Sequence, residues 1–492
     1  MPQPILLSGA FPAVLACGLG CSGPLSGIMV WGIGFENRTG PAVDAGGGGG
    51  SRMVPRARFP ALSIGADFRR LWLAQALSSF GEYLFAGTSV VWVATSLFPD
   101  SPRLPALVGA VVLAAAVPRI VVGPLAGVYA DRWCARRTMI VNDCLRAGLF
   151  TLLLGAVQVI RLTEVQIYAA ILVCIVVSET SAQFFNPARA AVMHVAIPED
   201  RRVDAASMSM FSLTGVAIIA AAAGPALFGI FGATVAISVC VVMYSASGVM
   251  VVRSGDHYQP ARVAGNRFWR DFTEGVRATW RTPSLRIVVI GACLYGVSMG
   301  INNSVLALFG MKTLDLSAAR YGLLAMMFPV GNMVSAVLGP RLIQRIGVDR
   351  AYPAALSALG LGYLVYACAG GLVTACVLML ACGVIFSIYI MCQGPIVQAA
   401  VPEGYMGRIS AVLGPVVSIA AAVSTLCASQ ALSFAGARGV VVGEGGWDDP
   451  YRLLIMSGAA FLLIGGGGMA YAQARRDTVR GVADGVTSTG RA

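Results

Sequence analysis

Long runs of apolar residues dominate the chain from about residue 70 to residue 473. The run ALVGAVVLAAAVPRIVVGPLAGVYA, residues 106–130, lacks the alternation of apolar and polar positions that marks the strands of a membrane barrel. A helix needs about 20 mostly apolar residues to cross a bilayer. Twelve such runs predict twelve membrane-spanning helices. They cover residues 71–97, 105–129, 138–160, 165–188, 206–230, 232–252, 286–310, 319–343, 351–370, 372–396, 409–434 and 452–473.

A polar segment, residues 253–285, separates the runs into two sets of six. Short stretches repeat across it. GVYADRWCARR (127–137) ends the second run and GPRLIQRIGVDR (339–350) ends the eighth, while Pro198–Glu199 and Pro402–Glu403 follow the fourth and tenth runs. These repeats indicate a duplicated six-helix unit. We therefore expect an all-α integral membrane fold of two pseudo-symmetric six-helix bundles, with a substrate site between them near the bilayer midplane.

The predicted domains follow from this division. They are an N-terminal bundle (53–252), a cytoplasmic linker (253–285), a C-terminal bundle (286–473) and a cytoplasmic tail (474–492). In the linker, Phe268, Phe272, Val276 and Trp280 recur every four residues between arginines, which favours an amphipathic helix at the inner membrane surface over a plain linker.

The first 52 residues do not fit the bundle. They are rich in Gly, Ser and Pro, lack the positive start of a secretory signal, and end in GGGGGSR before Met53. We interpret residues 1–52 as a low-complexity extension and expect the natural chain to start near Met53. A thirteenth span and a cleaved signal are the alternative interpretations.

Composition supports a membrane protein. Of the 492 residues, 57% are hydrophobic and only 12% are charged, whereas soluble domains carry roughly 25% charged residues. A soluble enzyme, a disordered chain and a disulfide-rich secreted domain are therefore excluded.

The net charge of +12 indicates an orientation rather than a nucleic-acid surface, because the basic residues lie in short segments between apolar runs. With both termini in the cytoplasm, about 26 basic residues lie inside and about six lie outside. This asymmetry predicts a multi-pass protein of the bacterial cytoplasmic membrane with both ends inside.

No pattern in the sequence points to a metal, a cofactor or an enzyme. The 12 cysteines are scattered, no CxxC pair occurs and there are only two histidines. No HExxH motif and no GxxxxGK[ST] loop is present. We expect no cofactor and no catalytic site; the expected partners are a small-molecule substrate, protons and lipid, and the expected state is a monomer.

Charged residues inside the predicted spans are the best functional candidates, because a charge in the bilayer core is costly unless it is paired or hydrated. All lie in the first half: Glu82, Arg119, Asp143, Arg146 and Glu179. The second half offers only amides, namely Asn302, Asn303, Asn332, Gln393 and Gln430.

Depth along the helices suggests which charges meet. Glu82 and Arg119 both fall near the middle of the membrane and can pair. Asp143, Arg146 and Glu179 lie at a similar depth, nearer the inner side, and can form a second cluster. All five are proton-coupling candidates, with Glu82 the first choice because SSFGEYL places it after a glycine of the first span. Static ion pairs are the alternative for each group, and attraction of cationic substrates is a further alternative for Glu82.

Aromatic residues of the predicted spans are candidates for lining an apolar pocket. These are Tyr83, Phe184, Phe185, Tyr295, Phe309, Phe328 and Tyr389. For each of them taken alone, a packing or lipid-facing position is the favoured interpretation.

Two motifs carry a family resemblance. The loop after the second span contains Gly127, Asp131, Arg132, Arg136 and Arg137 with the spacing GxxxDRxxxRR. The fifth span contains GVAIIAAAAGPALFG, from Gly215 through Gly224–Pro225 to Gly229. With twelve spans, the chain resembles a major facilitator superfamily (MFS) transporter over about residues 68–475, in the exporter branch that includes enterobactin- and macrolide-efflux-type proteins.

The resemblance implies a secondary transporter that exports a small amphipathic compound (a drug, an antibiotic or a siderophore) in exchange for protons by alternating access. It also implies that Asp131 joins a latch to the eleventh span, whereas the alternative is a positive-inside loop with one incidental acid. The second-half copy has Gln344 where the first has Asp131, so no latch is expected there. Uptake of a small metabolite and a non-transporting sensor or scaffold are the alternative functions.

Overall fold

A computed structural model describes residues 65–123, 126, 133–160, 162–197, 201–255, 273, 276–277, 279–400, 406–438 and 449–489. The N-terminal extension, the linker helix around Phe268 and Phe272, and Gly127, Asp131 and Arg132 of the loop motif lie outside the described residues.

The described chain is helical. The first half, which is the name used here for the helices from α2 to α7, comprises α2 (Ala66–Trp92), the π-helical turn η1 (Val93–Leu97), α3 (Leu104–Val121), α5 (Ala135–Val159), α6 (Glu164–Ala196) and α7 (Arg202–Val252). The second half comprises α9 (Pro283–Leu308), the π-helical turn η3 (Phe309–Thr313), α10 (Ala318–Ile346), α11 (Val348–Ala367), α12 (Leu372–Ala400), α13 (Met406–Ala437) and α14 (Pro450–Thr489).

The chain reverses direction within α7. Gly232 has φ 80° and ψ −179°, which interrupts the helix. Residues other than glycine rarely adopt this backbone conformation. On one side of it, the Thr88 hydroxyl donates to the Gly224 carbonyl. On the other side, the Cys240 thiol donates to the Gly81 carbonyl. Both arms of α7 thus contact the same stretch of α2, so α7 contains the predicted fifth and sixth spans, joined without a loop.

Nine helices of the described chain are long and apolar enough to cross a membrane. One of them is α7, which holds two predicted spans. The predicted first and ninth spans correspond to α2 with η1 and to α11. The described residues of all twelve predicted spans are therefore mainly helical, and the all-α membrane fold is confirmed. The division into domains at residues 253–285 stays a prediction.

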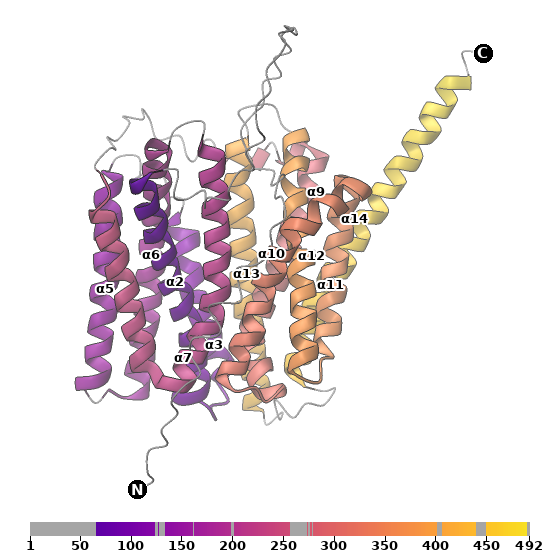
Figure 1. The fold of residues 1–492 in the computed structure, drawn as a ribbon. Helices are drawn as coiled ribbons and strands as arrows, with labels where there is room; N and C mark the ends of the chain where they lie inside the picture. The colour runs from indigo at the N-terminus through magenta and orange to yellow at the C-terminus, as the bar shows by residue number, and fades with distance from the viewer. Residues whose placement is uncertain are drawn as a thin grey trace, which may run out of the picture. The chain divides into compact units, whose positions relative to one another are not determined.

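Local sequence determines where several helices begin. Thr163 and Gln166 form a reciprocal capping box at the start of α6, and the Ser317 hydroxyl accepts from the Arg320 backbone at the start of α10. Asp449 accepts from the Tyr451 backbone N–H at 3.0 Å, which caps α14. Helix α14 then continues to Thr489 and projects past the ends of its neighbours (Figure 1).

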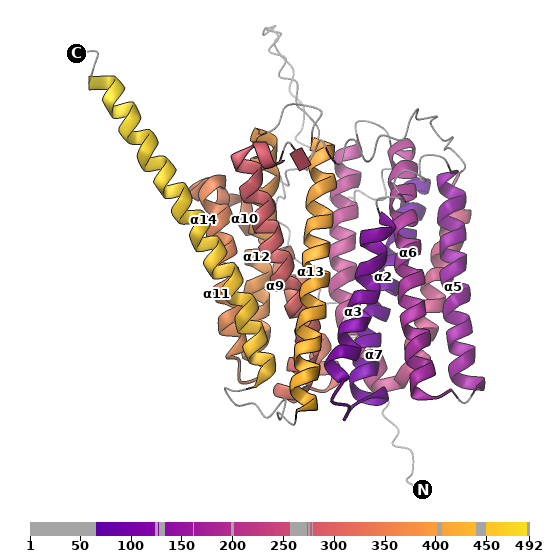
Figure 2. The same ribbon diagram turned by 180° about the vertical axis from the view of Figure 1, so that it is seen from behind.

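Each half has its own aromatic core. In the first half, the Phe150 ring packs edge-on against Phe85 and stacks on Tyr244. In the second half, Tyr389 stacks on Tyr352 and Phe386 stacks on Tyr295. The halves meet where α3 packs against α13 and α7 packs against α10 (Figures 1 and 2).

Small residues allow these interfaces to be close. A Cβ atom at Gly322 of α10 would lie 2.7 Å from the Ala222 carbonyl oxygen of α7, and one at Gly229 of α7 would lie 2.8 Å from the Ala318 Cβ atom. A Cβ atom at Gly109 of α3 would collide with Ser429 of α13. All these contacts lie at the end of the bundle that bears the connections 98–103 and 314–317, which we call the predicted outer end.

Candidate functional site

A cavity of about 290 Å³ lies between the two halves, at the middle of the helices. Its first-half wall comes from α2, α3 and α6, and its second-half wall comes mainly from α9 and α13, with Tyr321 from α10. The two walls differ in charge. Among the described residues, the ionisable carboxylates and guanidinium that line the cavity are Glu82, Arg119 and Glu179, all from the first half.

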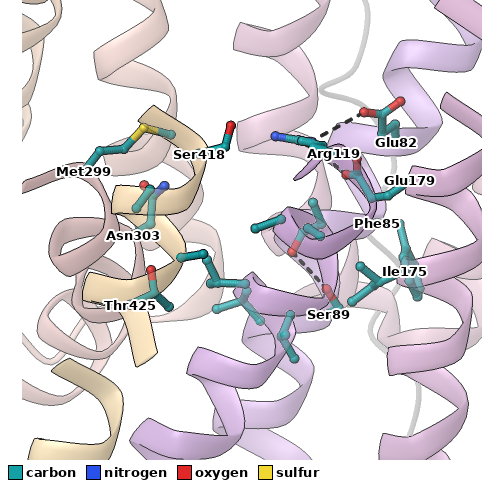
Figure 3. A pocket seen from close by; sticks show the side chains of 18 of the residues that line it. Glu82, Phe85, Ser89, Arg119, Ile175, Glu179, Met299, Asn303, Ser418 and Thr425 are labelled. Carbon is teal, nitrogen blue, oxygen red and sulfur yellow. Dashed lines mark hydrogen bonds and ion pairs between the residues drawn. The ribbon is translucent and has the colours of Figure 1, made fainter. Parts of the chain in front are cut away.

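These three side chains form a charge triad around Arg119 (Figure 3). The Arg119 Nε atom donates to Glu179 Oε2 at 2.9 Å, and its Nη2 atom donates to Glu179 Oε1 at 2.9 Å. The same Nη2 atom lies 4.0 Å from Glu82 Oε1. Arg119 therefore binds Glu179 in a bidentate manner, which is the strong arrangement for a guanidinium and a carboxylate. Its contact with Glu82 is longer and weaker.

Exposure separates the two carboxylates. The Glu82 side chain is 21% exposed and the Glu179 side chain is 6% exposed. Glu82 is thus the carboxylate that a proton or a ligand in the cavity can reach, whereas Glu179 serves mainly as the counter-ion of Arg119. The predicted pairing of Glu82 with Arg119 is present, at the outer limit of an ion pair.

Asp143 and Arg146 lie elsewhere, in a fully buried cluster outside the cavity lining. Ser247 and Ser78 donate to the two oxygens of Asp143 at 2.6 and 3.2 Å. Arg146 donates to the Ser78 hydroxyl and to the Ser178 carbonyl, both at 2.9 Å. This cluster ties α5 to α2, α6 and α7.

The expected cluster of Asp143, Arg146 and Glu179 is therefore wrong in its third member. Glu179 and Ser178 are neighbours on α6, yet Arg146 binds the Ser178 backbone while the Glu179 side chain turns to Arg119. The depths of these residues were similar, but depth along a helix does not determine the direction in which a side chain points.

The second-half wall combines neutral polar groups with apolar side chains. Asn303, Ser418 and Thr425 lie opposite the charge triad, with Met299 beside them (Figure 3). Arg119 points across the cavity toward the side on which Ser418 lies (Figure 3). Asn303 was among the amides noted in the sequence, whereas Ser418 and Thr425 were missed because isolated hydroxyls in apolar runs give no distinguishing pattern.

The aromatic side chains of the cavity differ from the sequence candidates. The lining aromatics are Phe85 and Tyr321. None of the seven candidates (Tyr83, Phe184, Phe185, Tyr295, Phe309, Phe328 and Tyr389) lines it. Several pack inside a half instead: Tyr295, Phe328 and Tyr389 surround Phe386, and Phe184 stacks on Trp133.

Two arginines represent the loop motif in the described chain. Arg136 donates to the carbonyls of Val251 and Val252, the first at 3.3 Å and the second at 2.5 Å, and so caps the C-terminal end of α7. Arg137 is exposed. The predicted latch depends on Asp131, which lies outside the described residues.

The fifth-span motif has a packing role at two of its glycines. A Cβ atom at Gly224 would lie 2.5 Å from the Leu84 carbonyl oxygen, so α2 and α7 approach closely there. Pro225 faces α2 at Gly87, and Gly229 lies against α10. Gly215 has open space around it. The motif's link to antiport stays a prediction.

Two sets of membrane helices around a central cavity are the architecture of a secondary transporter that works by alternating access. The family model of the Major Facilitator Superfamily matches residues 71–425. The chain belongs to this superfamily. No curated relative matches it by sequence.

Solved structures share the fold at low identity. The nucleoside transporter NupG is 13% identical, with a TM-score of 0.63, over 81% of this chain and 98% of that one. A bacterial homologue of the lysosomal transporter Spinster, inward-facing, is 16% identical, with a TM-score of 0.62, over 82% and 96%. A bacterial homologue of the iron transporter ferroportin, also inward-facing, is 14% identical, with a TM-score of 0.62, over 82% and 97%.

Proposed function

We propose that this transporter exports a small amphipathic compound (a drug, an antibiotic or a siderophore) in exchange for protons, by alternating access between its two halves. The observation that carries the proposal is the charge triad in the wall of the central cavity. The cavity otherwise offers apolar surface from Phe85, Ile175 and Leu306 together with the neutral polar groups Asn303, Ser418 and Thr425. Such a lining suits an amphipathic molecule.

Glu82 is the proposed proton carrier. Arg119 is held by Glu179 through two hydrogen bonds of 2.9 Å, so a proton can neutralise Glu82 without breaking that pair. Glu82 also lines the cavity, so its charge acts directly on whatever occupies the cavity. A proton and a substrate that both bind at this carboxylate compete, and such competition couples their movements in opposite directions.

The buried cluster of Asp143 and Arg146 is proposed to stabilise the fold, with no part in proton transport. Both side chains are almost completely buried, and their hydrogen bonds are made within the first half. Proton exchange at Asp143 requires opening the contacts among four helices, whereas Glu82 is reached from the cavity.

The test is accumulation of a fluorescent amphipathic cation in an efflux-deficient bacterial host. We compare the wild type, Glu82→Gln, Glu164→Gln and an empty vector, each with and without a protonophore, at matched membrane expression. Glu164 is a suitable control because it is an exposed acid at the start of α6, away from the cavity. We expect the wild type and Glu164→Gln to accumulate less cation than the empty vector, and Glu82→Gln to accumulate as much. We expect the protonophore to abolish this difference.

Two outcomes separate the parts of the proposal. Protonophore-sensitive export by Glu82→Gln equal to that of the wild type would contradict the role of Glu82. Equal accumulation in all strains would exclude broad export of cations, and the same comparison would then be made with a siderophore produced by the cell.

A further inference from the structure

Lys312 is the only lysine in the sequence, and it bridges the two halves. It lies in the π-helical turn η3, directly after α9. Its Nζ atom donates to the Pro99 carbonyl at 3.0 Å, and Pro99 belongs to the connection that follows the π-helical turn η1 in the first half. The contact therefore joins equivalent places in the two halves, just past the first helix of each.

Both partners are fixed to their own half. In the second half, the neighbouring Thr313 donates to Asp449 Oδ2 at 2.5 Å, and Asp449 caps α14. In the first half, Phe98 packs edge-on against Tyr168 of α6, whose hydroxyl donates to the Leu107 carbonyl at 2.9 Å. Because each partner moves with its own half, the distance from Lys312 to Pro99 reports the separation of the halves at this end.

The contact is a single hydrogen bond to a backbone carbonyl. Among the described residues, no carboxylate oxygen lies within 4.0 Å of Lys312. One neighbouring polar contact crosses the same interface: Ser433 donates to the Pro102 carbonyl at 3.5 Å. Both hydrogen bonds lie at the predicted outer end.

We propose that the Lys312–Pro99 hydrogen bond is a latch that holds the predicted outer end closed and that breaks whenever the cavity opens to the outside. Lys312 is then a positioning residue of the transport cycle, one that sets the balance between the two open states without touching the substrate. The inference goes beyond the proposed function, since it depends on neither the cargo nor the coupling ion.

The first test uses the single side-chain amine. A membrane-impermeant amine-reactive ester is added to intact cells, and modification of Lys312 is measured by mass spectrometry relative to the denatured protein. We compare the wild type with Gly322→Val, which wedges α7 from α10, and with Gly215→Val, whose site is open. We expect slow modification in the wild type and Gly215→Val, and a rate roughly tenfold higher in Gly322→Val, the change that corresponds to losing one hydrogen bond from a charged donor.

The second test removes the latch and reads access to the cavity. Asn303→Cys provides a thiol reporter on the exposed second-half wall, and an impermeant thiol reagent is added from outside. The same background without Asn303→Cys corrects for native cysteines. We expect Lys312→Met to raise reporter labelling roughly tenfold, Lys312→Arg to restore slow labelling because it can still donate, and Arg320→Met, at the same end of the second half, to leave it unchanged.

Either of two results would overturn the latch. One is modification of wild-type Lys312 as fast as in the denatured protein, which would mean that the amine is not held. The other is identical reporter labelling in Lys312→Met and the wild type. Neither readout requires transport of any probe, so a failure of the latch is distinguishable from a failure of the proposed export.

Discussion

At the scale of single residues, the charges of the first half divide into two groups by what surrounds them. Glu82, Arg119 and Glu179 line the cavity, whereas Asp143 and Arg146 are enclosed by α2, α5, α6 and α7. A group that faces the cavity can change its charge during transport. A group enclosed by helices stabilises them as long as its charge stays balanced.

This division predicts unequal effects on stability for two similar substitutions. Asp143→Asn removes the buried carboxylate beside Arg146, and we expect the free energy of unfolding to fall by about 1–3 kcal/mol. Glu82→Gln leaves the Arg119–Glu179 pair intact, and we expect a change within about 0.5 kcal/mol. Thermal unfolding of the purified proteins in detergent measures both. A larger loss for Glu82→Gln than for Asp143→Asn would contradict the division.

The Arg119–Glu179 pair predicts non-additive effects. Arg119→Gln leaves a carboxylate that is 6% exposed without its partner, at a cost of about 1.5–3 kcal/mol. In the double variant with Glu179→Gln, no buried carboxylate is left without its partner at this position. We therefore expect the double variant to unfold at a higher temperature than Arg119→Gln alone. A double-mutant cycle of thermal unfolding checks this. Additive losses would mean that the two residues act independently.

The sequence identified all three charged residues of the cavity but not their arrangement. An ionisable residue within an apolar run is conspicuous, and its depth follows from the rise per residue. The rotation of each helix, which decides that Glu179 meets Arg119 and that Arg146 does not meet Glu179, depends on packing between helices that are far apart in the chain. Ser418 and Thr425 could not be predicted, because isolated hydroxyls in apolar runs form no pattern.

At the scale of elements, glycines that look alike in the fifth-span motif have different surroundings. Gly224→Ala places a Cβ atom against the backbone of α2, and we expect it to destabilise the protein by about 1–3 kcal/mol. Gly215→Ala enters open space within a helix, and we expect it to be neutral or to stabilise by up to about 1 kcal/mol. Thermal unfolding in detergent compares them, and equal effects would show that α2 and α7 do not pack as described.

The helices themselves were predictable because about 20 apolar residues in a row have few alternatives to a membrane span. The π-helical turns η1 and η3 were not, since nothing in their sequences, VATSL and FGMKT, distinguishes a π-helical turn from the end of an α-helix. Lys312 is one of about six basic residues that the predicted orientation places outside. Its contact with Pro99 joins segments 213 residues apart, which no local pattern reveals.

At the scale of the whole molecule, the distribution of arginine predicts an orientation that the latch and the export direction both depend on. A fluorescent protein fused after Ala492 is expected to fluoresce in the cytoplasm. Alkaline phosphatase inserted at Asp315, in the connection at the predicted outer end, is expected to be active. The opposite pair of results would invert the assignment of the two ends.

The reversal at Gly232 has a consequence for how the protein is made. Because one residue joins the fifth and sixth spans, the pair leaves no loop outside the membrane that is long enough to be translocated by itself. We therefore expect the two arms to enter the bilayer together, as a hairpin, during synthesis. A substitution that straightens this turn would produce one 51-residue rod, far longer than the bilayer is thick. Gly232 is thus expected to matter for insertion of the first half into the membrane, before its helices pack against one another.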